Sequence, residues 1–64
     1  MSDDTVVTYI GRSARSNLAL VRGPGGKVRF WLADNYFDNY SDFVTVEEMI
    51  WYLTHAIDVL KGLR

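Results

Sequence analysis

The sequence predicts the α+β class: a three-stranded antiparallel β-meander packed on one face by a C-terminal α-helix (βββα). Two observations support this prediction. Three segments rich in β-branched and aromatic residues come first, and one segment with a helical apolar stripe comes last. Successive strands without an intervening helix favour antiparallel neighbours, and an apolar sheet face needs a second layer to cover it. The 64 residues of the chain are expected to form a single domain, 1–64.

The three expected strands cover residues 5–10, 18–22 and 27–33. Between the second and the third, Gly23-Pro24-Gly25-Gly26 predicts a hairpin turn, because proline restricts φ and glycine adopts positive φ without steric cost. A five-residue loop would direct one set of side chains toward the helix, namely Leu18, Leu20, Val28, Phe30 and Leu32. The opposite, half-exposed face would carry Ala19, Val21, Lys27, Arg29 and Trp31.

The expected helix covers residues 46–61. Thr45 and Glu48 fit the two ends of a capping box, and Val44 and Met49 occupy the positions of a hydrophobic staple. Apolar residues then recur at steps of three and four, at Val46, Met49, Ile50, Leu53, Ala56, Ile57 and Leu60. We expect this stripe to close the core over the sheet, and Gly62 to follow the end of the helix.

The net charge of −1 conceals a polarised chain. Residues 11–29 contain five cationic side chains and no acid, whereas residues 30–60 contain six acidic side chains and no Lys or Arg. Such asymmetry steers association with charged partners even when the net charge is small. The alternative is that both sets only solvate the surface.

The segment 34–43 (DNYFDNYSDF) alternates aspartates with aromatic residues, and we expect an acidic-aromatic loop or a short helix there. On a helix, the carboxylates of Asp34, Asp38 and Asp42 would form a row that rises about 6 Å per step. Extended by Glu47 and Glu48, this row would present the regularly spaced negative charge that a nucleic-acid-binding groove attracts. The alternative role of these aspartates is to form turns and caps through side-chain to backbone hydrogen bonds.

Aromatic side chains next to these acids would supply contact area. Trp51 lies on the polar side of the expected helix, where a large aromatic residue is an interface candidate. The alternative for Trp51 is packing over the sheet edge or under the 34–43 segment. The predicted partner-binding residues are Asp34, Tyr36, Asp38, Tyr40, Asp42, Glu47, Glu48 and Trp51.

Catalytic and metal-binding motifs are not recognisable. The chain has no cysteine, and its single histidine, His55, has no nucleophile or metal cluster beside it in the sequence. The calcium-loop pattern near DNYFDN lacks its glycine and its terminal glutamate. Gly23-Pro24-Gly25-Gly26 lacks the Gly-Lys-Ser/Thr ending of a phosphate loop. We therefore expect no catalytic residue, no metal and no cofactor, and the protein is not expected to be an enzyme.

A second interpretation uses the basic segment. A three-stranded sheet backed by a helix can lay a cationic face on DNA, and the alternative nucleic-acid-binding residues are Arg22, Lys27, Arg29 and Trp31. Residues 28–48 resemble the plant-type DNA-binding fold of that shape in the strand VRFWLA and the helix entry TVEE. The acidic stretch DNYFDNYSD departs from its pattern, and the chain as a whole is not basic.

In size, charge layout and acidic-aromatic content, the whole chain resembles anti-CRISPR proteins, the small inhibitors encoded by phages and mobile elements. The resemblance implies a stoichiometric inhibitor whose acidic surface mimics DNA and blocks the nucleic-acid-binding site of a CRISPR-Cas surveillance complex. The implied partner is a protein with a basic groove in the cytoplasm of a bacterial host. No apolar run or signal-peptide pattern indicates a membrane. We expect a monomer or weak homodimer, and a homodimeric module closed by Trp31 or Trp51 is a further alternative.

Overall fold

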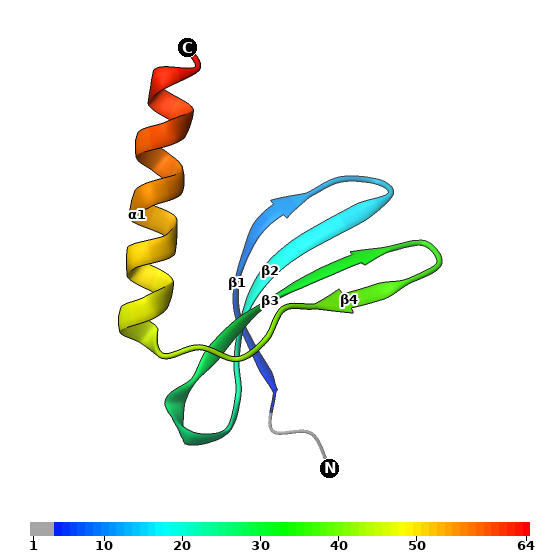
Figure 1. The fold of residues 1–64 in the computed structure, drawn as a ribbon. Helices are drawn as coiled ribbons and strands as arrows, with labels where there is room; N and C mark the ends of the chain where they lie inside the picture. The colour runs from blue at the N-terminus through cyan, green and yellow to red at the C-terminus, as the bar shows by residue number, and fades with distance from the viewer. Residues whose placement is uncertain (1–3) are drawn as a thin grey trace.

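The structure, a computed structural model, describes residues 4–64. An antiparallel sheet in the order β1-β2-β3-β4 is followed by one helix, so the predicted α+β class is confirmed (Figure 1). The strands are β1 (Thr5–Arg12), β2 (Ser16–Arg22), β3 (Val28–Asp34) and β4 (Asp38–Tyr40), and the helix is α1 (Val46–Gly62). A short 3₁₀ turn, Pro24–Gly26, joins β2 to β3. The expected number of three strands is wrong, because the sheet has four.

The fourth strand lies in the segment for which a loop or short helix was expected. β4 pairs with β3 through Trp31 and Tyr40, Leu32 and Asn39, and Ala33 and Asp38. The Asp34 carboxylate accepts hydrogen bonds from two amides just downstream, which turns the chain back on itself where a helix would have continued. The helical row of carboxylates is therefore not formed.

The β2–β3 register is the predicted one. Leu18 lies opposite Leu32 and Leu20 opposite Phe30, as a five-residue loop requires. Gly25 and Gly26 have φ values of 69° and 73°, in the left-handed region that residues with a Cβ rarely adopt. The turn chemistry thus sets which side chains share a face.

The sheet face that was expected to be half-exposed is buried more completely than the face that was expected to meet the helix. We call the side of Ala19, Val21, Arg29, Trp31 and Ala33 the closed face, and the side of Leu18, Leu20, Val28, Phe30 and Leu32 the open face, on which Val28 is also buried. Ala19 and Val21, on the closed face, are 0% and 2% exposed, whereas Leu32 on the open face is 47% exposed. The closed face is buried because aromatic and arginine side chains of the same sheet fold over its small residues.

Helix α1 begins as predicted but does not close the core. The Thr45 hydroxyl accepts a hydrogen bond from the Glu48 amide at 3.1 Å and donates one to the Glu48 carboxylate at 3.2 Å. Met49 is the buried residue of α1, and the remainder of the apolar stripe is exposed. The expectation that Val46, Ile50, Leu53, Ile57 and Leu60 seal the sheet is wrong, because α1 runs beside the sheet and away from it (Figure 1).

Gly23 is a position where the addition of a single methyl group should lower stability measurably. It is buried, and a Cβ added there would fall on the Cε1 and Cζ atoms of the Phe43 ring. We expect Gly23→Ala to lower the free energy of unfolding by about 1–3 kcal/mol, the usual cost of overpacking. Urea denaturation measures this loss. A Cβ at Gly11 would meet no atom within 4 Å, so Gly11→Ala should leave stability unchanged or slightly raised, and an equal loss in both variants would contradict the packing explanation.

Candidate binding surface on the β3–β4 hairpin

The second hairpin carries most of the predicted binding residues, and we call its residues 34–42 the acidic arm. At its tip, Asp34 Oδ1 accepts hydrogen bonds from the Tyr36 and Phe37 amides, each at 2.7 Å. The Asp34 amide donates to the Phe37 carbonyl oxygen at 3.0 Å. Asp34 therefore has the turn-forming role that was the alternative interpretation of these aspartates, and it orders the tip.

The same two amides stabilise the ionised Asp34 carboxylate and lower its pKa below the ordinary value of 3.8. A lowered folded-state pKa means that the stabilisation is fully present above the unfolded-state pKa and is lost as the pH falls through the folded-state pKa. We expect Asp34→Ala to reduce the urea midpoint at neutral pH, and the difference from wild type to shrink at about pH 2. The control is Asn35→Ala in the same turn, whose effect should not change with pH. A pH-independent effect of Asp34→Ala would contradict the hydrogen-bond assignment.

Two aromatic side chains project from the tip. Tyr36 is 86% exposed and Phe37 is 67% exposed, with their ring centroids 6.5 Å apart. Tyr36 was predicted as a contact residue, whereas Phe37 was not. The DNYF stretch could have indicated both residues as exposed. In a tight turn two neighbouring side chains can both project into solvent, whereas in a strand they would point to opposite faces.

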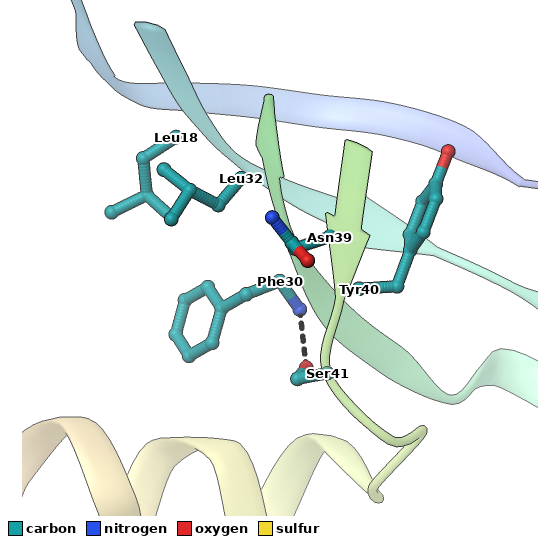
Figure 2. A pocket seen from close by; sticks show the side chains of 6 residues that line it. All are labelled: Leu18, Phe30, Leu32, Asn39, Tyr40 and Ser41. Atoms are coloured by element: carbon teal, nitrogen blue, oxygen red, sulfur yellow. Dashed lines mark hydrogen bonds between the residues drawn. The ribbon is translucent and has the colours of Figure 1, made fainter. Parts of the chain in front are cut away.

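The middle of the acidic arm is anchored to the sheet. Trp31 Nε1 donates to Asp38 Oδ1 at 3.3 Å, and the Trp31 and Tyr40 rings stack at a centroid distance of 6.3 Å. The Ser41 hydroxyl accepts from the Phe30 amide at 2.8 Å (Figure 2). These contacts hold the arm as a continuation of the sheet, so Asp38 and Tyr40 have defined positions on the closed face.

The other predicted acids lie where the arm leads into the helix. Asp42 follows β4, and Glu47 and Glu48 occupy the first turn of α1, where the helix dipole favours negative charge. Glu48 is engaged in the cap. The structure therefore brings Asp34, Tyr36, Asp38 and Tyr40 together on one hairpin, and places the remaining acids at its base.

Trp51 is separate from this set. It is 64% exposed, stacks on His55 at a centroid distance of 5.7 Å, and contacts Tyr52 edge-on. Its ring contacts are with residues of α1 itself. The alternative in which Trp51 is buried over the sheet edge or under residues 34–43 is therefore wrong. It remains an exposed aromatic residue on the polar side of α1.

The alternative basic set does not form one surface. Arg29 pairs with the Asp4 carboxylate, and its guanidinium carbon lies 4.1 Å from the Tyr40 ring centroid and 4.2 Å from that of Phe43. Arg22 lies opposite Val28 and so points to the other side of the sheet. Arg29 and Trp31 serve the closed face of the protein itself, and Phe43, which the sequence did not single out, completes that arrangement.

Two further cations lie at the same end of the sheet as the arm tip. Arg12 ends β1 and Arg15 lies in the β1–β2 connection, and Ser16, the first residue of β2, pairs with Asp34. The Arg12 guanidinium carbon lies 4.4 Å from the Tyr9 ring centroid. The tips of the two hairpins thus lie near each other (Figure 1), and the sequence gives them side chains of opposite charge.

Comparison with known proteins adds no relative. No protein-family model matches the sequence, and neither curated proteins nor solved structures give a significant match. Among residues 4–64, no group of three or more His, Asp or Glu side chains is arranged to hold a metal ion. The same residues include no helix with the length and apolar character that a membrane crossing requires.

Proposed function

We propose that the protein is a non-enzymatic inhibitor that binds a basic nucleic-acid-binding surface of a protein partner, as anti-CRISPR proteins do with a CRISPR-Cas surveillance complex. The acidic arm is the proposed binding element, and Asp42 and Glu47 at its base extend the negative charge. Asp34 and Glu48 hold the turn and the helix cap in shape. The mimicry rests on the sign and exposure of the charges, since no helical row of carboxylates is present.

The observation that carries the proposal is the exposed aromatic pair at the tip of an acidic hairpin. Tyr36 and Phe37 are largely exposed and lie between Asp34 and Asp38 in the chain. A groove that binds nucleic acid offers arginine and lysine side chains, which pair with carboxylates and stack on aromatic rings. Aromatic side chains also give contact area at a low cost in side-chain entropy.

A second consideration favours this function over direct binding of nucleic acid. Arg29 is occupied by Asp4, Tyr40 and Phe43, and Trp31 by Tyr40 and Asp38. These side chains would have to give up contacts that hold the closed face before they could bind a phosphate or a base. The acidic arm has no comparable internal requirement for Asp42 or Tyr36.

The test is a plaque assay in bacterial hosts whose CRISPR-Cas systems, one type per strain, block a phage. Expression of the protein should restore plaques in at least one strain. Asp42→Lys should weaken binding to the responsible complex about tenfold at low salt, because a favourable charge pair becomes a repulsive one. Asp58→Lys changes the net charge equally but lies near the far end of α1, so it should retain activity. Equal loss in both variants would show that net charge, not the arm, is responsible, and plaques restored in no strain would overturn the proposal.

A further inference from the structure

The open face is an apolar surface that nothing in residues 4–64 fully covers. Three of its side chains, those of Leu18, Phe30 and Leu32, line a hollow of about 330 Å³ together with Asn39, Tyr40 and Ser41. In Figure 2 Leu18, Phe30 and Leu32 project from one side of the sheet, and Tyr40 stands on the other. The neighbours of the open face on β1 are Thr8 and Gly11, which are small and uncharged. A surface of this shape and composition suits an apolar helix.

Helix α1 carries a matching surface that is also exposed. Its apolar residues recur at steps of three and four and share one side of the helix with Met49. Met49 on this side is 5% exposed, whereas Ile50, Leu53 and Leu60 are 54%, 36% and 61% exposed. The apolar stripe is therefore buried at Met49, and its later residues are exposed to solvent.

The attachment of α1 prevents it from lying across its own sheet. Val28 and Val44 exchange two backbone hydrogen bonds, each 2.9 Å long, and Met49 is buried immediately beyond. These contacts hold the helix start at the β2–β3 turn. From there α1 and the strands diverge (Figure 1). Covering the open face with the chain's own helix would require these contacts to break.

The accessible surface of the chain is larger than that of a compact monomer by about the area of one protein interface. The accessible surface is 5227 Å², which exceeds the value of about 4,200 Å² for a compact monomer of 7.3 kDa by about 1,000 Å². The radius of gyration is 12.9 Å, against about 11 Å for a compact domain of this length. A standard protein interface buries about 800 Å² on each partner. The excess surface is thus of the size that one specific interface would remove.

We propose that the open face is covered by α1 of a second copy of this chain, in a symmetric homodimer in which each helix occupies the open face of the other copy. The same chain supplies both surfaces, so one two-fold axis satisfies both at once. Both are apolar and uncharged at their centres, as the core of a homodimer interface requires. The chain has no cysteine to provide a stabilising disulfide, and association is another means by which small domains complete their cores.

This dimer is independent of the proposed inhibitory function. Asn39 and Ser41 of the acidic arm border the open-face hollow, but the exposed tip residues Tyr36 and Phe37 and Asp38 on the closed face lie outside the two surfaces. Trp51, on the polar side of α1, also stays accessible in the dimer. The dimer is measured on the purified protein alone, whereas inhibition requires a partner complex. If the protein does not dimerise, the inhibitory function can still be tested, and if it does not inhibit, the dimer can still be tested.

The experiment is sedimentation velocity of the 64-residue protein over a wide range of concentrations, with circular dichroism to confirm folding. Wild type should sediment as a dimer. Leu53→Glu in the helix stripe and Leu32→Glu on the open face should each weaken dimerisation by at least 100-fold. Thr54→Glu, next to Leu53 but on the polar side of α1, should remain dimeric.

A wild-type protein that stays monomeric at the highest concentration would overturn the proposal. So would a Leu32→Glu variant that dimerises as well as wild type, because helix pairing alone would then explain association. Leu32 is half-exposed in the isolated chain, so Leu32→Glu should leave the fold of the monomer intact. It therefore tests the interface even if the Leu53→Glu variant unfolds.

Discussion

Arg29→Ala is expected to produce one of the largest losses of stability of any exposed or half-buried position. The substitution removes a guanidinium that lies between the Tyr40 and Phe43 rings and pairs with Asp4. Each partly desolvated cation–π contact contributes about 1 kcal/mol, and the aliphatic stem also packs. We expect the free energy of unfolding to fall by about 2–3 kcal/mol, measured by urea denaturation.

Two controls separate shape from charge at this position. Arg29→Lys keeps the positive charge but cannot stack on two rings at once, so it should recover less than half of the loss. Arg22→Ala removes an exposed arginine at the end of the neighbouring strand and should change stability by no more than about 0.5 kcal/mol. If Arg29→Lys were as stable as wild type, the ion pair and not the aromatic sandwich would hold the closed face.

Ala19→Leu is the second substitution with a large expected effect. Ala19 is 0% exposed and lies between Tyr9 on β1 and Trp31 on β3, so a larger side chain has no space without displacing an aromatic ring. We expect a loss of about 3 kcal/mol, at the upper end of the usual cost of overpacking. Thermal or urea unfolding measures it.

The control is Ala14→Leu, the same change at an exposed position of the β1–β2 connection. It should leave stability within about 0.5 kcal/mol of wild type. A neutral Ala19→Leu would mean that the closed face is not the core, and would return that role to the open face.

Local chemistry explains what could be predicted from the sequence. The Gly23–Gly26 turn determines the β2–β3 register through two positive φ angles, and Thr45 caps α1 through its own hydroxyl. Both features depend on residues close together in the chain. The start of α1 and the pairing of Leu18 with Leu32 were therefore predictable.

Contacts between distant residues explain what could not be predicted. Arg29 reaches Asp4 across 25 positions, and Phe43 lies over Gly23; together these side chains bury the face that alternation alone marked as half-exposed. In the candidate site, the spacing of Asp34 and Asp38 fits a helix as well as a hairpin. Only the two hydrogen bonds to Asp34 Oδ1 decide between them, and they place the acids on a strand and a turn instead of a helical row.

Competition with target DNA tests the proposed inhibition most directly. A purified CRISPR-Cas surveillance complex from a strain in which plaques are restored is incubated with labelled target DNA and increasing amounts of the protein, at low and at high salt. We predict that bound DNA disappears near one equivalent of protein, that inhibition weakens as salt rises, and that Asp42→Lys inhibits less than Asp58→Lys. If the complex retained its DNA at a large excess of protein, the acidic arm would not be a competitor of nucleic acid.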